Sequence, residues 1–135
     1  MALINWNDSF SVNVAEIDQQ HQKLIALINE LHDAMTQGKG EDILGKSLNG
    51  LISYTGTHFK TEEKYFAQFG YPDTDSHKKE HHAYVQKVSD FKDGFENGEL
   101  SLSIEVMTFL YDWWRNHIKE TDKKYSQFFN EKGLR

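Results

Sequence analysis

The stretch HFKTEEKYFAQFGYPDTDSHKKEH, residues 58–81, contains two pairs of polar side chains spaced one helical turn apart. His58 and Glu62 form the first pair, and His77 and His81 form the second. Between the pairs, Gly70-Tyr71-Pro72-Asp73 is a turn signal. Residues i and i+4 share one face of an α-helix. The stretch therefore predicts two helices that each present a polar pair on one face and are joined by a short turn.

Two further turn signals, Gln37-Gly38-Lys39-Gly40 and Glu96-Asn97-Gly98-Glu99, divide the rest of the chain. They leave an arm at residues 1–16 and helices at roughly 18–37, 41–69, 74–96 and 101–129. Asp18 is a suitable N-cap for the first helix, and Trp6 and Phe10 are expected to pin the arm to the helices. Short connections favour antiparallel neighbours. We therefore expect an all-α, up-down-up-down antiparallel four-helix bundle in which residues 1–135 form a single domain.

Each predicted helix has one apolar stripe with the three- and four-residue spacing of a buried helix face. The stripes comprise Ile17, His21, Leu24, Ile28, Leu31 and Met35; Leu44, Leu48, Leu51, Thr55, His58, Glu62, Tyr65 and Phe69; His77, His81, Tyr84, Val88, Phe91 and Phe95; and Val106, Leu110, Trp113, His117, Tyr125 and Phe128.

Composition excludes several classes of protein. The net charge of −6 would repel a phosphate backbone, so we expect no nucleic-acid partner. The sequence has no cysteine, which excludes disulfides, thiolate zinc sites and iron–sulfur clusters. Any metal must be held by histidine and carboxylate. No signal peptide or apolar run long enough for a membrane span is visible, so we expect a cytoplasmic protein without membrane attachment.

Five of the seven histidines lie on the apolar stripes, and so does Glu62. Burying an imidazole or a carboxylate is costly unless it is paired or bound to metal. One such residue could be a satisfied core group, but polar donors on all four helices favour a metal site. Asp122 follows His117 by five residues, about 140° around a regular helix. It reaches the core from the edge of the stripe or through a local helix distortion. His32, His82, Glu63 and Glu80 are expected to face solvent.

The polar residues resemble, as a set, the ligand signature of the hemerythrin family. The flanking segments Ile17–His21, His58–Glu63 and Gly70–Pro72 are similar too, as is Trp113 ahead of His117-Ile118. The resemblance covers essentially the whole chain. It implies a non-haem di-iron centre with an oxo or hydroxo bridge. The implied ligands are His77, His81 and His117 on one iron, His21 and His58 on the other, and Glu62 and Asp122 bridging both.

By this resemblance, the iron held by His21 and His58 has one open position, where dioxygen would bind. The oxygen pocket would be lined by Leu24, Phe59, Trp113 and Ile118, and Tyr125 would hydrogen-bond near the bridging carboxylates. Trp114 stands where the family favours a smaller aliphatic residue. It could narrow the oxygen route or face solvent.

The expected function is reversible dioxygen binding, in storage, transport or sensing, without enzymatic activity. The alternative is a di-iron enzyme acting on peroxide or nitric oxide, and a third reading is an iron-holding bundle without gas chemistry. Five imidazoles and two carboxylates differ from the carboxylate-rich shell of di-iron oxygenases. Seven donors also exceed what a zinc site needs.

Overall fold

The computed structural model describes residues 3–98 and 102–135, without the side chains of residues 41, 42, 102, 103, 118 and 119. The described residues form helices and no strands. The long helices are α1 (Ala15–Thr36), α2 (Gly40–Phe69), α3 (Thr74–Glu96) and α4 (Leu102–Trp113). A π-helix (Trp114–Thr121), a 3₁₀-helix (Asp122–Tyr125) and α5 (Ser126–Glu131) continue directly from α4.

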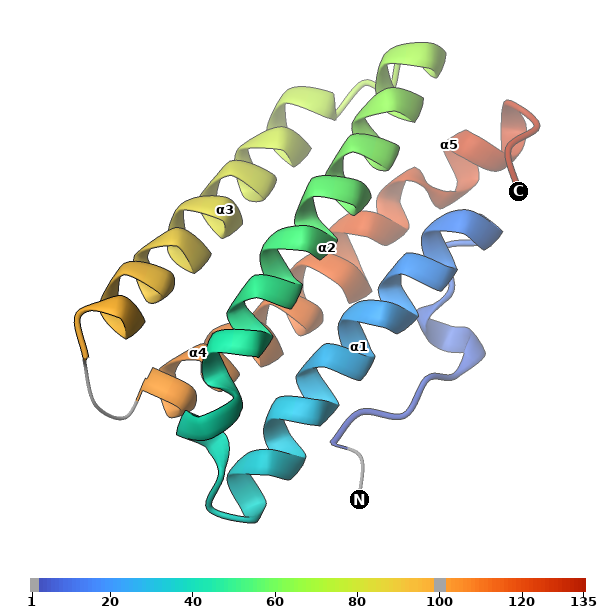
Figure 1. Ribbon diagram of the computed structural model, residues 1–135. Helices are drawn as coiled ribbons and strands as arrows, with labels where there is room; N and C mark the ends of the chain where they lie inside the picture. The colour runs from blue at the N-terminus through green and yellow to red at the C-terminus, as the bar shows by residue number, and fades with distance from the viewer. Residues whose placement is uncertain (1–2, 99–101) are drawn as a thin grey trace.

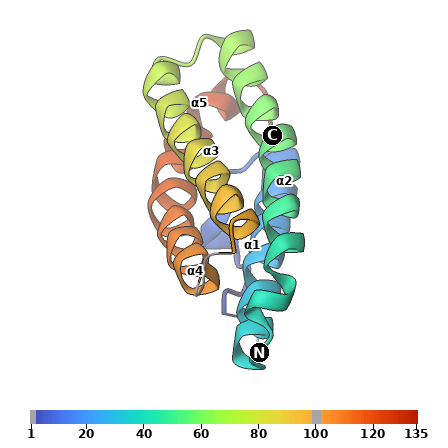
Figure 2. The same ribbon diagram turned by 60° about the vertical axis from the view of Figure 1, so that its left-hand side comes forward.

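These elements form an antiparallel four-helix bundle (Figures 1 and 2). The chain descends through α1, rises through α2, descends through α3 and rises again from α4 to α5. The predicted fold class is therefore confirmed. Among the described residues, no helix combines the length and the apolar character that a bilayer span requires.

The α2–α3 connection shows how local sequence ends a helix. Gly70 has φ of 70°, in the left-handed region, and its N–H donates to the carbonyl of Phe66 at 2.9 Å. Glycine adopts this conformation without the steric cost that a Cβ imposes. The N–H of Tyr71 also donates to the Phe66 carbonyl, and Pro72 follows, where a helix cannot continue.

The fourth helix is not regular, in contrast to the single helix expected at 101–129. A π-helix followed by a 3₁₀-helix separates α4 from α5. These segments change the angular register of the side chains that follow. As a result Phe129 is fully buried, whereas Phe128, expected on the stripe, is only partly buried. In α2, Phe66 is likewise more buried than the expected Tyr65.

The N-terminal arm packs along the bundle, and polar side chains as well as aromatic ones fix it there. The Asn29 amide exchanges hydrogen bonds with the backbone of Ile4 at 2.9 and 2.8 Å. Asp18 is not an N-cap, because α1 already begins at Ala15. Its carboxylate instead accepts from the Ser11 hydroxyl at 2.5 Å and the Val12 N–H at 2.8 Å. Asp18 therefore ties the arm to α1.

The buried apolar side chains form two clusters. In α1 and α2 a buried polar residue falls between members of the two clusters. In α1, for example, His21 lies between Ile17 of one cluster and Leu24 of the other. In α2, Glu62 lies between Phe59 and Phe66. The bundle therefore holds one polar layer between two apolar layers, which shield it from water.

Candidate metal centre

The structure brings all seven polar residues expected at the site into one buried cluster. None exceeds 2% exposure. The residues are His21 from α1, His58 and Glu62 from α2, His77 and His81 from α3, His117 from the π-helix and Asp122 from the 3₁₀-helix.

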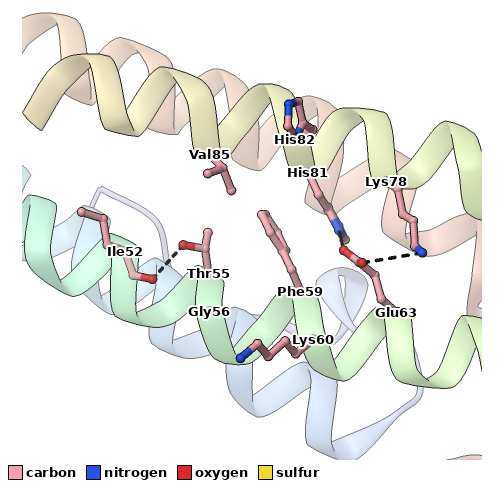
Figure 3. A pocket seen from close by; sticks show the side chains of 10 residues that line it. All are labelled: Ile52, Thr55, Gly56, Phe59, Lys60, Glu63, Lys78, His81, His82 and Val85. Atoms are coloured by element: carbon pink, nitrogen blue, oxygen red, sulfur yellow. Dashed lines mark hydrogen bonds and ion pairs between the residues drawn. The ribbon is translucent and has the colours of Figure 1, made fainter.

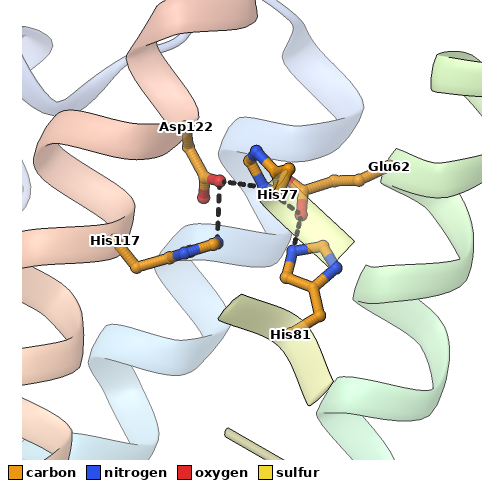
Figure 4. Close-up of side chains that lie close together, drawn as sticks. All are labelled: Glu62, His77, His81, His117 and Asp122. Atoms are coloured by element: carbon orange, nitrogen blue, oxygen red, sulfur yellow. Dashed lines mark ion pairs between the residues drawn. The ribbon is translucent and has the colours of Figure 1, made fainter. Parts of the chain in front are cut away.

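Their donor atoms form two overlapping groups, each with all its atoms within 4.8 Å of one another. One group contains His77, His81 and His117, the other contains His21 and His58, and both contain Glu62 and Asp122. Figure 4 shows the first group, with the two carboxylates pointing at the imidazoles. The Nε2 atoms of His77 and His117 lie 2.8 and 3.0 Å from Asp122 Oδ1, and that of His81 lies 3.0 Å from Glu62 Oε1.

The π-helix accounts for the position of Asp122. The N–H of Asp122 donates to the His117 carbonyl, five residues earlier. This is the hydrogen bond of a π-helix, and it brings side chains five apart onto one face. The sequence left two ways for Asp122 to reach the core, from the edge of the stripe or through a local helix distortion. The structure shows the helix distortion.

The arrangement of the donor atoms suits bound cations better than hydrogen bonds within the cluster. The Nε2 atoms of all five histidines, Glu62 Oε1 and both Asp122 oxygens are buried, and their contacts with one another, at 2.8 to 3.7 Å, lack the geometry of hydrogen bonds. Buried polar groups in folded proteins are almost always satisfied. Nitrogen and oxygen atoms gathered in two overlapping groups, in contact but not aligned as hydrogen bonds, are what two bridged cations require.

Charge within the cluster shifts several pKa values. Burial alone would lower the pKa of His77, but the carboxylates of Asp122 and Glu62 raise it to about 9. Burial would also lower the pKa of His117, but the carboxylates of Asp122, Glu80 and Glu62 raise it to about 10. The pKa of His58 is lowered, mainly by burial. Since cations bind neutral imidazole, they must displace protons from His77 and His117.

Three polar residues outside the cluster form hydrogen bonds with the outer ring nitrogen, Nδ1, of three of the five ligand histidines. Nδ1 of His58 lies 2.7 Å from Gln20 Oε1, Nδ1 of His81 lies 3.1 Å from Glu63 Oε2, and Nδ1 of His117 lies 2.9 Å from Glu80 Oε1. The expectation that Glu63 and Glu80 are simply solvated is therefore wrong. Each is flexible enough to reach a histidine of another helix. His82 is exposed as expected, but His32 is half-buried.

Tyr125 is fully buried, and its hydroxyl donates a hydrogen bond to Glu62 Oε2. The other oxygen of Glu62 faces the imidazoles of His58, His77 and His81 at 3.2, 3.7 and 3.0 Å. Tyr125 therefore fixes the carboxylate with Oε1 directed at the cluster.

Aromatic rings cover the three-histidine group. Phe59 stacks on His81 with ring centroids 3.7 Å apart, and Trp113 stacks on His117 at 4.0 Å. Leu24 is fully buried in the adjoining apolar cluster. The side chain of Ile118, expected in the same pocket, lies outside the described part of the chain.

A groove of about 540 Å³ runs between α2 and α3 and reaches the cluster's outer edge (Figure 3). Phe59 and His81 line it together with Ile52 and Val85. Phe59 stacks on His81 there, so its ring covers one face of this imidazole.

Trp114 faces neither solvent nor this groove. It is 6% exposed and packs edge-on against Phe10 of the arm, with ring centroids 5.2 Å apart. Phe10 in turn contacts Trp6. The larger aromatic residue at position 114 therefore anchors the arm.

Comparison with known proteins agrees with this geometry. The family model described as the hemerythrin HHE cation binding domain matches residues 12–129. The bacteriohemerythrin of Methylococcus capsulatus is 38% identical, over 93% of this chain and 95% of that protein. The bacteriohemerythrin of Stenotrophomonas maltophilia is 34% identical, over 93% of this chain and 81% of that protein. The crystal structure of a wild-type hemerythrin superimposes with a TM-score of 0.84 at 36% identity, covering 93% of this chain and 97% of that one. The chain belongs to the hemerythrin family.

Proposed function

We propose that this protein binds dioxygen reversibly at a di-iron centre held by His21, His58, Glu62, His77, His81, His117 and Asp122. The observation that carries the proposal is the set of buried donor atoms that contact one another without forming hydrogen bonds, arranged as two overlapping groups. Two ferrous ions held by these residues would supply the electrons that reversible dioxygen binding requires.

The ligand sets of the two groups differ by one imidazole. The group of His77, His81 and His117 offers five protein donors, and the group of His21 and His58 offers four. Since both share the same carboxylates, a small ligand has room at the two-histidine group. Leu24, Phe59, Trp113 and Ile118 are the apolar residues proposed to keep water from this ligand, and Tyr125 holds Glu62 in place.

The exclusion of water from the centre favours reversible dioxygen binding over catalytic turnover of peroxide or nitric oxide. Phe59 and Trp113 stack on ligand histidines, and the apolar clusters close the polar layer on both sides. A site shielded in this way limits proton supply to a bound ligand. This supports a binding protein rather than an enzyme that reduces peroxide or nitric oxide.

The test is reconstitution of the protein with ferrous iron under argon, followed by visible spectra through cycles of oxygen and argon. We expect an oxygen-dependent absorption band that disappears under argon and returns in later cycles, with zinc-loaded protein as the control. Irreversible oxidation in the first cycle, or sustained consumption of peroxide or nitric oxide, would overturn the proposal in favour of an enzyme.

A further inference from the structure

The outer hydrogen bonds of the ligand histidines differ between the two halves of the centre. In the three-histidine half, the outer partners of His81 and His117 are the carboxylates of Glu63 and Glu80. In the two-histidine half, the outer partner of His58 is the neutral amide of Gln20. The outer nitrogen of His21, Nδ1, has no hydrogen-bond partner among the described residues, while its Nε2 lies 2.9 Å from Asp122 Oδ2.

Each outer partner is itself held in place. The Thr121 hydroxyl donates to Glu80 Oε1 at 3.0 Å, and the Lys78 ammonium lies 3.9 Å from Glu63 Oε1. Figure 3 shows Glu63 between His81 and Lys78. The hydrogen bond from Thr121 keeps the Glu80 carboxylate directed at Nδ1 of His117, and the Lys78 ammonium adds positive charge beside Glu63.

Gln20 is oriented by a short chain of hydrogen bonds. Its Nε2 donates to Thr61 Oγ1 at 3.1 Å, and the Thr61 hydroxyl donates to the Thr57 carbonyl at 3.0 Å. The amide nitrogen is therefore occupied, and the amide oxygen is left to face His58 Nδ1. Because Nε2 of His58 is directed at the cluster, Nδ1 carries the proton and donates a hydrogen bond to this oxygen.

The chemical consequence differs between the two kinds of partner. A carboxylate that accepts from a ligand imidazole makes that imidazole a stronger donor and adds negative charge near the cation. An amide fixes the ring but adds no charge. The three-histidine half has two such carboxylates in addition to its larger ligand set.

We propose that Glu63 and Glu80 are positioning residues that make the three-histidine half the tighter cation site. Gln20 keeps the two-histidine half the weaker one, so the two cations bind in a fixed order. This inference rests on the cation centre of the proposed function but not on dioxygen binding. It also places the weaker-held cation where the small ligand is proposed to bind.

The test is a titration of metal-free protein with Co²⁺ under argon. Competition with a coloured chelator gives two stepwise association constants, and the cobalt absorption bands report each binding step. We expect the first constant to exceed the second clearly. Because no oxygen is present, a failure of oxygen binding would remove the proposed function and leave this result intact.

Three isosteric variants separate electronic from merely structural roles. Glu80→Gln and Glu63→Gln should each lower the first constant about tenfold to a hundredfold while the second stays nearly unchanged. Gln20→Glu should raise the second constant toward the first, which lost packing could not do. Glu30→Gln is the control, since Glu30 also forms a partly exposed contact, with Lys46 at 3.4 Å, and should change neither constant.

Three results would overturn the inference. These are two indistinguishable constants in the unmodified protein, an equal fall of both constants in Glu80→Gln, or an unchanged or lower second constant in Gln20→Glu. Absence of any Co²⁺ binding would remove both this inference and the proposed function.

Discussion

The backbone N–H of Asp122 donates a hydrogen bond to the carbonyl oxygen of His117, five residues earlier. This π-helical contact brings His117 Nε2 to 3.0 Å from Asp122 Oδ1, although a regular α-helix would direct the two side chains apart. Asp122 can then contribute to both ligand groups, which is the arrangement that a bridging carboxylate needs.

Removing either of these two ligands should reduce cation content. We expect His117→Ala and Asp122→Asn to bind one cation or none per chain, measured by elemental analysis after dialysis. At free cation about a thousandfold above Kd, loss of binding removes about 4 kcal/mol of stabilisation. The control is His82→Ala, because His82 is exposed and neighbours His81 without belonging to either group. Equal cation content in all three variants would contradict the ligand assignment.

Tyr125→Phe should weaken cation binding without unfolding the protein. The change removes the hydroxyl that donates to Glu62 Oε2 and leaves a buried oxygen without that partner. We expect cation affinity to fall about tenfold, as for other outer-shell losses, and the metal-free protein to lose about 1–3 kcal/mol. Tyr65→Phe is the matched control, since the Tyr65 hydroxyl donates to the exposed carboxylate of Glu16. Similar chelator-competition curves for the two variants would show that Tyr125 does not position Glu62.

The metal-free protein should become less stable as the pH rises. The pKa values of His77 and His117, about 9 and about 10, exceed the ordinary value of 6.5. Below pH 6.5 both states are protonated and the stabilisation from these groups is complete. Between 6.5 and the folded-state values the folded protein binds more protons than the unfolded one, so stability falls with pH.

Urea unfolding with a chelator present, at pH 7 and at pH 9.5, measures this change. The urea midpoint should be lower at pH 9.5. The cation-loaded protein should lack this part of the pH dependence, because its ligand histidines are already neutral. A midpoint that stays level or rises in the metal-free protein would show that His77 and His117 are not protonated at neutral pH.

Phe59→Ala should open the metal centre to water. The Phe59 ring stacks on His81 at the inner edge of the α2–α3 groove, so its removal would join the groove to the cluster. We expect the oxygen-dependent band of the iron-loaded protein to be lost irreversibly at least severalfold faster, followed by visible absorption over time. Val85→Ala is the control, because Val85 lines the same groove but is 48% exposed. Equal rates in both variants would show that Phe59 does not shield the site.

Four helical segments and the polar pairs on their faces could be predicted from the sequence alone. Helix spacing is a local property, so His58 with Glu62 and His77 with His81 were bound to share a helix face once those helices formed. The energetic cost of burying such groups then indicated metal rather than an ordinary core. The apolar stripes of the four helices must bury one another, so the bundle could be predicted from them, and the polar residues on the stripes predicted its polar layer.

The residues that contact the polar layer from outside could not be predicted from the sequence, because they depend on how the helices pack. Gln20, Glu63 and Glu80 meet histidines 38, 18 and 37 residues away, and their position beside the stripe gave no sign of a partner. Packing between helices selects which edge residues meet, and a long side chain can turn either to solvent or to a neighbouring helix. The contact of Trp114 with Phe10 has the same origin. Local periodicity fixes the face of a helix, but the opposing helix and the arm fix the contacts made there.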